Sequence, residues 1–376
     1  MKIIHIGPDD QFIQFIADVF EEVAPGVNHY LITELLSKEL RHLTLQTDDF
    51  TVIGSGKKGL LSIPKHVKSC DMIIVHGMGI HGIVAFLASP RKTLRVWSGW
   101  GFDYYGNNID SKMGLLSQST KNLISEKKSD RVKISFLKFI KRALFKQAVM
   151  IATKKTDYFS APIPTDFSIF KRRFDTFRGE YSQLNYGSVS DTFSHGYLEQ
   201  DGINILVGNS AAPTNNHIDI FKLLSKCNLG SRKVIVPLSY GDPNYRERIL
   251  ICGRELLGDS FFPLINYMPL EKYNNIIASC NVVIMNHYRQ QALGNICTAL
   301  YQGLHVYLNI KSPAYSFFNK IGAVMHDIQH LNLKSLPLTR VPDEDIAKNR
   351  EALEGFWGRN QVKANVENLL AKVRRR

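Results

Sequence analysis

The sequence lacks the features that define several large classes of protein. Its five cysteines are scattered, without a Cys-x-x-Cys pair or a His cluster at metal-ligand spacing, a pattern that favours a reducing cytoplasm and no structural metal. No window holds about eighteen uncharged apolar residues. The N-terminal MKIIHIGPDD has too short an apolar run for a signal peptide. We therefore expect a cytoplasmic protein without a membrane-spanning helix.

Two common nucleotide-binding motifs are also missing. The first strand-to-helix turn offers only Gly7 before Pro8, so the triple-glycine dinucleotide fingerprint is absent. The stretch Gly54–Leu60, GSGKKGL, lacks the Lys-Ser/Thr that follows the last glycine of a P-loop. An oxidoreductase or ATPase function therefore loses its main support.

What is present is a repeated alternation of apolar strands and amphipathic helices. With 376 residues, 44% of them apolar and 22% charged, the chain suits two folded domains of roughly 150–200 residues each. The alternation breaks near residue 195, and it resumes in the second half. We predict two Rossmann-like α/β domains, 1–195 and 196–358, facing a cleft. A last helix within 359–376 is expected to pack back on the first domain.

The formal charge of +13 is concentrated in one segment. Between Lys121 and Arg173 there are fourteen Lys or Arg and four acids. Within it, Lys133–Val149 has apolar residues at helical spacing and surplus phenylalanines, which is typical of a helix lying on an anionic bilayer. A surface helix packed on its own domain is the alternative. Nucleic-acid binding ranks lower, because no recognition motif accompanies the charge.

Polar and aromatic residues follow two predicted strands of the first half, at the sheet edge where doubly wound folds bind ligands. His76 ends one strand and Asp103 follows the other. The accompanying residues are Gly77, Trp97, Trp100, Gly101, Tyr104 and Tyr105. Flat aromatic faces suit a sugar ring. Asp103 is the candidate base for an attacking hydroxyl, and His76 is a second candidate that alternatively holds the substrate. For each, a purely structural role is the other interpretation.

In the second half, the stretch Ile203–Ile218 contains a strand that stops at Gly208, Asn209 and Ser210 and is expected to lead into a helix. Such a turn presents backbone N–H groups to a phosphate. Further candidates follow neighbouring strands: Tyr240, Arg289, Gln290, Gln291, Gly294 and Asn295. We predict that these residues bind a nucleotide diphosphate, with Arg289 neutralising charge and a second helix opening at Gly294. No Asp-x-Asp pair accompanies these strand ends, so no bound metal is implied.

These same residues resemble a known family. ILVGNS with Asn215 and His217, the strand end VPLSYG, and RQQALGN (Arg289–Asn295) resemble the nucleotide-binding half of glycosyltransferase family 56. In the first half, His76-Gly77 and the pattern Trp100-Gly101-x-Asp103-x-Tyr105 are similar to that family's strand ends. The resemblance implies the two-domain type B glycosyltransferase fold.

The resemblance also implies an activity. It is sugar transfer from a dTDP-sugar to a polyprenyl-diphosphate-linked oligosaccharide by a peripheral protein of the inner membrane face, with no cofactor besides the donor. Departures from the family pattern at Ala211–Pro213 favour a related O-antigen or capsule transferase over the enzyme of enterobacterial common antigen synthesis.

The sequence thus predicts a metal-independent glycosyltransferase. Asp103 or His76 serves as the base, the second domain binds the nucleotide-sugar, and residues 121–173 contact an anionic membrane. The rival hypothesis is a non-catalytic sugar- or nucleotide-binding protein of the same fold.

Overall fold

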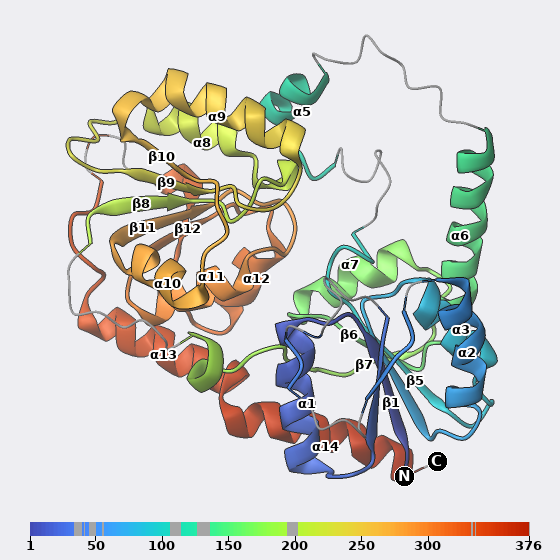
Figure 1. Ribbon diagram of the computed structural model, residues 1–376. Helices are drawn as coiled ribbons and strands as arrows, with labels where there is room; N and C mark the ends of the chain where they lie inside the picture. The colour runs from blue at the N-terminus through green and yellow to red at the C-terminus, as the bar shows by residue number, and fades with distance from the viewer. Residues whose placement is uncertain are drawn as a thin grey trace. The chain divides into compact units, whose positions relative to one another are not determined.

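The chain folds into two compact units, each built around a parallel sheet (Figure 1). The computed structural model describes residues 1–33, 40, 42–44, 50–54, 56–105, 114–125, 136–193, 202–331, 334 and 336–375. Unit 1 comprises Met1–Asn107, Val132–Ser188 and Arg359–Arg376, and unit 2 comprises Asn108–Arg131 and Val189–Gly358. The predicted fold class, α/β with two Rossmann-like domains, is confirmed.

Unit 1 has a seven-stranded sheet in the order β3-β2-β1-β4-β5-β6-β7. Its strands are β1 (Ile3–Gly7), β2 (Asn28–Ile32), β3 (Phe50–Val52), β4 (Met72–His76), β5 (Leu94–Ser98), β6 (Tyr158–Ser160) and β7 (Glu180–Tyr181). Its helices are α1 (Gln11–Val23), α2 (Lys57–Val67), α3 (Ile80–Ala88), α6 (Phe136–Lys155), α7 (Thr165–Arg173) and α14 (Arg359–Arg374). The strand order reverses between β1 and β4, and their carboxyl ends form the switch point at which such sheets bind ligands.

Helices α1 and α14 lie side by side on one face of this sheet (Figure 1). Phe20 of α1 and Leu369 of α14 are fully buried, and they pack in one core cluster with Ile74 of β4. At the rim, Glu22 of α1 pairs with Lys363 of α14 at 2.6 Å. The final helix of the chain therefore completes the core of unit 1.

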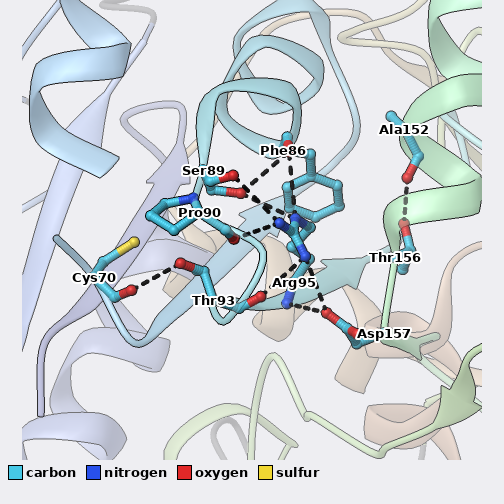
Figure 2. Close-up of polar contacts among 9 residues, drawn as sticks. All are labelled: Cys70, Phe86, Ser89, Pro90, Thr93, Arg95, Ala152, Thr156 and Asp157. Carbon is cyan, nitrogen blue, oxygen red and sulfur yellow. Dashed lines mark hydrogen bonds and ion pairs between the residues drawn. The ribbon is translucent and has the colours of Figure 1, made fainter. Parts of the chain in front are cut away.

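A buried arginine of β5 joins the end of α3 to the start of β6 (Figure 2). Arg95 of β5 is 5% exposed, and its guanidinium donates to Ser89 Oγ at 3.0 Å and to four backbone carbonyls. Those carbonyls belong to Phe86, Ser89, Pro90 and Thr93. Asp157, just before β6, accepts the Arg95 backbone N–H at 2.8 Å and lies 3.7 Å from Nη1. The rigid five-donor fork of arginine suits this convergence.

Unit 2 has a six-stranded sheet in the order β10-β9-β8-β11-β12-β13. Its strands are β8 (Asn204–Val207), β9 (Val234–Pro237), β10 (Phe261–Leu264), β11 (Cys280–Met285), β12 (His305–Leu308) and β13 (His326–Asp327). Its helices are α5 (Gln118–Ser125), α8 (His217–Leu224), α9 (Pro243–Leu257), α10 (Leu270–Ala278), α11 (Leu293–Tyr301), α12 (Pro313–Lys320) and α13 (Asp343–Trp357). Here the order reverses between β8 and β11. Among the helices that the structure describes, none is long and apolar enough to cross a membrane.

Helix α5 belongs to unit 2, although its place in the chain lies between two strands of unit 1. The Ser117 backbone N–H donates to Asn216 Oδ1 at 2.8 Å, and Asn216 Nδ2 donates back to the Leu115 carbonyl at 3.3 Å. Leu123 and Ile124 pack against the core of unit 2. Lys121, the first residue of the basic segment 121–173, therefore lies in unit 2, and the later part of that segment lies in unit 1.

We predict that Arg95→Lys lowers the free energy of unfolding by about 2–4 kcal/mol, because lysine cannot supply the fork and leaves buried carbonyls unpaired. Urea unfolding followed by tryptophan fluorescence measures the change. Lys348→Gln is the control, since Lys348 forms an exposed pair with Glu344 and its loss should leave the unfolding midpoint unchanged. Equal stability of the Arg95→Lys variant and the wild type would contradict the assigned role.

Candidate functional site

The turn after β8 is held by a buried asparagine. Gly208 has a φ of +68°, and the next backbone N–H, that of Asn209, donates to Asn215 Oδ1 at 2.9 Å. Asn215 is 1% exposed, and its Nδ2 donates to the carbonyls of Ser210 and Ala212 at 2.9 and 3.0 Å. The loop consequently folds back over the end of β8.

The helix expected after this turn is present, but it does not begin at Gly208–Ser210. Pro213 starts a short 3-10 turn, Asn216 stops it in the left-handed conformation with a φ of +50°, and α8 begins at His217. Asn216 and His217 are fully buried. The N-terminus of α8 is therefore closed by its own loop, and the alanine-alanine-proline run that delays it was visible in the sequence.

Side-chain hydrogen bonds join four of the residues that were predicted to bind the nucleotide diphosphate. Asn209 Nδ2 donates to the Tyr240 hydroxyl and Asn209 Oδ1 accepts from Gln291 Nε2, both at 2.9 Å. Gln291 Oε1 accepts from Arg289 Nε at 2.9 Å and from Thr214 Oγ1 at 2.7 Å. We call Asn209, Tyr240, Arg289 and Gln291 the amide cluster. It spans the carboxyl ends of β8, β9 and β11, and Tyr240, 59% exposed, forms its outer edge.

Two other predicted residues of this region are buried. Ser210 is 2% exposed, and its Oγ accepts from Asn215 Nδ2 at 3.2 Å. Gln290 is 8% exposed. Both side chains lie inside the protein, so their contact with a ligand stays a prediction.

The N-terminus of α11 is open, in contrast to that of α8. It follows Ala292, which has a φ of +60°, and no side chain caps it. Gly294 is exposed, and a Cβ added there would meet no atom within 4 Å. Asn295 Nδ2 donates to the Tyr273 hydroxyl at 2.8 Å. Uncapped N–H groups beside the cationic Arg289 make this end of the sheet favourable for an anion.

Two buried histidines stand behind the turn. Burial lowers the pKa of His217 to about 3. Burial, together with the nearby Arg289 and His217, holds the pKa of His287 well below its usual range. His287 Nε2 lies 2.8 Å from Asn215 Oδ1. Since that oxygen is an acceptor, a neutral His287 must donate through Nε2. These imidazoles are neutral supports of the turn.

In unit 1, Asp103 organises the loop after β5. Its carboxylate accepts hydrogen bonds from Trp97 Nε1 at 2.7 Å, the Met78 backbone N–H at 2.9 Å and the Trp100 backbone N–H at 3.0 Å. Burial raises the pKa of Asp103, and these hydrogen bonds oppose part of the rise. Together these donors and the Asp103 backbone N–H fix the orientation of the carboxylate.

His76, the other predicted base, is committed to a hydrogen-bond chain. Asn28 Nδ2 donates to Glu21, so Asn28 Oδ1 is the atom that accepts from His5 Nε2 at 3.4 Å. His5 Nδ1 then accepts from His76 Nε2 at 3.1 Å. His76 Nδ1 lies 3.1 Å from the Tyr186 hydroxyl, which also hydrogen-bonds with the Ser98 hydroxyl. Burial and the neighbouring His5 hold the pKa of His76 well below its usual range. The geometry favours Asp103 over His76 as the base.

The aromatic residues near Asp103 divide into two groups. Trp97 and Tyr104 are fully buried, and the Tyr104 hydroxyl donates to buried Asp166, so the expectation that they face a sugar is wrong. Trp100 lies nearer the surface. The ring centroid of Trp100 is 5.8 Å from that of Phe12, which is 39% exposed, and Phe102 of the same loop is 51% exposed. We call Phe12, Trp100 and Phe102 the aromatic edge.

Thr214, Tyr273 and Phe12 complete these two sites, and sequence reasoning missed them. Thr214 lies in the short 3-10 turn between β8 and α8. Tyr273 and Phe12 lie on the helices α10 and α1, and not directly after the strands whose ends carry the predicted residues. An aromatic residue at the start of the amphipathic helix Gln11–Val23 is the signal that the sequence offered for Phe12.

The fold places the protein in a class. Two parallel-sheet units of this kind are the type B glycosyltransferase fold, and solved structures share it over nearly their whole length. Sucrose-phosphate synthase from Thermosynechococcus elongatus is 11% identical, with a TM-score of 0.63 and 99% of each chain covered. A glycosyltransferase from Rickettsia africae is 10% identical, with a TM-score of 0.63 and coverage of 99% of this chain and 98% of that one. Anabaena HepE, solved with UDP and glucose, is 13% identical, with a TM-score of 0.60 and coverage of 99% and 100%.

The family match is more specific than the fold. Residues 183–334 match the model of the family described as 4-alpha-L-fucosyltransferase, glycosyl transferase group 56. The resemblance to this family is confirmed over that stretch, and the protein is a glycosyltransferase. The matched residues include the amide cluster and the start of α11, whereas His76 and Asp103 lie outside them.

We predict that Gly208→Ala destabilises unit 2 through two separable effects. A Cβ at Gly208 would lie 2.6 Å from His217 Nε2 and 2.7 Å from Asn215 Oδ1, in addition to the strain of a positive φ. Gly230 has a φ of +55° and no atom within 4 Å of such a Cβ, so Gly230→Ala reports the strain alone, about 1–2 kcal/mol. Gly208→Ala should cost about 1–3 kcal/mol more. Equal losses in urea unfolding would show that the turn has room for a methyl group.

Proposed function

We propose that this glycosyltransferase moves a deoxy or amino sugar from a dTDP-linked donor to a lipid-linked oligosaccharide in the synthesis of a bacterial surface polysaccharide. The observation that carries the proposal is the amide cluster beside the open N-terminus of α11, within the stretch that matches the family. The family's description as a fucosyltransferase supports a deoxysugar donor.

The donor diphosphate binds at the N-terminus of α11. The backbone N–H groups of its first turn and the Arg289 guanidinium face the charge that grows on the departing phosphate as the bond from the sugar carbon breaks. Asn209, Gln291 and Asn295 contribute uncharged hydrogen-bonding groups. Since the amide cluster contains no carboxylate, the leaving group is stabilised by helix end and side chains rather than by a metal held there.

The acceptor binds at the aromatic edge of unit 1. Asp103 takes the proton from the attacking acceptor hydroxyl, while the Trp97 and backbone donors hold the carboxylate in place. Its raised pKa makes the carboxylate a stronger base than an exposed aspartate. His76 orients Tyr186 beside Trp100. The ring centroids of Tyr186 and Trp100 lie 5.4 Å apart.

Nucleotide binding tests the donor half of this proposal. We expect dTDP to raise the melting temperature more than UDP, GDP or ADP do, because binding to the folded state alone stabilises it. Arg289→Gln should reduce the dTDP shift by removing the cation beside α11. Arg254→Gln, an exposed cation on α9, is the matched control and should retain it. A protein that no nucleoside diphosphate stabilises would contradict the proposal. A dTDP shift without dTDP release from a dTDP-sugar and membrane extract would favour the non-catalytic rival.

Turnover and its pH dependence test the base. We predict that Asp103→Asn lowers kcat about a hundredfold or more and leaves the dTDP melting shift unchanged. Because the ionised form is the active one and its pKa is raised, the wild-type rate should fall on the acid side at a pH above the ordinary aspartate pKa of about 3.9. The pH profile of kcat at saturating donor measures this. Near-normal turnover of the variant, or an acid limb below that value, would show that another group is the base.

A further inference from the structure

Three helices of unit 1 form a surface without a single acidic residue. They are α2, α3 and α6, and α3 lies between the other two and contacts both (Figure 1). Their sequences contain nine Lys or Arg and no Asp or Glu. The cations whose side chains the structure describes are Lys57, Lys58, Lys65, Lys146, Lys154 and Lys155, and all are exposed. Lys138, Lys141 and Arg142 lie outside the described side chains.

Large apolar side chains are exposed on each of these helices. Leu61 of α2 is 81% exposed and Leu87 of α3 is 43% exposed. On α6, Leu144, Phe145 and Ile151 are 64%, 42% and 48% exposed. The mixture of exposed leucine, isoleucine and lysine without acids is typical of a surface that enters the headgroup region of a bilayer.

The first described turns of α6 have no cover from the rest of unit 1. Every residue from Ala143 to Gln147 is exposed, and burial begins only at Ala152 and Thr153, where the helix passes α3. Figure 1 shows the N-terminal part of α6 extending past the end of α3. A helix packed on its own domain would bury its apolar stripe along its length, so this alternative for the basic segment loses support.

The other face of the same sheet is charged differently. Helix α1 carries Asp18, Glu21 and Glu22 and no cation, and two of the four cations of α14, Arg359 and Lys363, pair with Glu22. Over the whole chain, unit 1 has 27 Lys and Arg against 16 acids, and unit 2 has 20 against 18. The unneutralised positive charge of the protein is therefore gathered in unit 1, away from the donor-binding unit.

We propose that the outer face of α2, α3 and α6 is the surface by which the protein docks on a bilayer of anionic phospholipid. The lysines meet the headgroups, and Leu61, Leu144, Phe145 and Ile151 enter the boundary between headgroups and acyl chains. The surface differs from the basic segment 121–173, because it includes α2 and α3 and excludes α5. The purpose of this surface, which is to bring the enzyme to a lipid-linked acceptor, rests on the proposed function. The surface itself does not.

A nucleic acid is the other polyanion that such charge attracts. The apolar residues argue against it, because phosphate contacts are made by cations and polar groups, and single strands stack on aromatic rings. Among the exposed large apolar residues on this face whose side chains the structure describes, Phe145 is aromatic and the others are leucine and isoleucine. Leucine and isoleucine side chains gain from leaving water only where an apolar phase receives them.

Vesicle flotation without donor or acceptor tests the surface. We expect binding to vesicles of phosphatidylglycerol and phosphatidylcholine and none to phosphatidylcholine alone. The triple changes K57Q/K58Q/K65Q on α2 and K146Q/K154Q/K155Q on α6 should each weaken binding at least tenfold. The control K222Q/K226Q/K272Q removes the same charge from exposed positions of unit 2 and should bind as wild type does. Loss in the α6 variant alone would overturn the three-helix surface.

Two further outcomes are decisive. Leu61→Ser with Leu144→Ser should weaken binding most at high salt, where the charge contribution is screened. Unchanged binding, together with equal affinity for double-stranded DNA, would show a general polyanion site and overturn the proposal. All variants should keep the dTDP melting shift. Absence of that shift in the wild type with intact vesicle binding would count against the proposed function and not against this surface.

Discussion

One buried carboxamide, that of Asn215, shapes the end of the second sheet. Its oxygen accepts from the Asn209 backbone N–H and lies 2.8 Å from His287 Nε2, and its nitrogen donates to Ser210 and Ala212. Both lone pairs and both hydrogens are thus used inside the protein. An aspartate there would face two carbonyls with an anion, so the neutral amide is required. Because the loop is pinned, Asn209 turns outward to Tyr240 and Gln291, and the amide cluster follows from a residue that no ligand touches.

In unit 1, carboxylates hold the loops that follow the strands. Asp103 holds its loop through Trp97 and two backbone N–H groups, and Asp9 accepts two backbone N–H groups from His42 and Leu43. An anionic edge repels a diphosphate, while an amide edge with a cation and an open helix end attracts one. The two sheets are built alike, and the charge at their carboxyl ends assigns the donor to unit 2 in the proposed reaction.

The sequence revealed the strands and the polar residues at their ends, because buried parallel strands are short apolar runs with few alternatives. It did not reveal what those residues contact. Ser117 and Asn216 are 99 positions apart when they form their hydrogen bond, and no local pattern predicts that α5 leaves one unit for the other. Trp97 was expected to face a sugar, yet it is fully buried. The type of a residue indicates its polarity, but it does not indicate which side of the sheet the side chain lies on. The sequence indicated through Pro213 that α8 starts late. It did not indicate that the start of α8 is buried.

The family match covers the proposed donor site and leaves out the aromatic edge and the helices α2, α3 and α6. Residues 183–334 cover the amide cluster and α11, which depend on particular backbone conformations at Gly208, Asn216 and Ala292. Few residues satisfy such positions, so a likeness there is specific. The aromatic edge and the face of α2, α3 and α6 need only exposed rings, leucines and lysines, which many sequences supply. The proposed donor site is thus supported by likeness to a family, whereas the proposed acceptor site and membrane surface are argued from burial and charge.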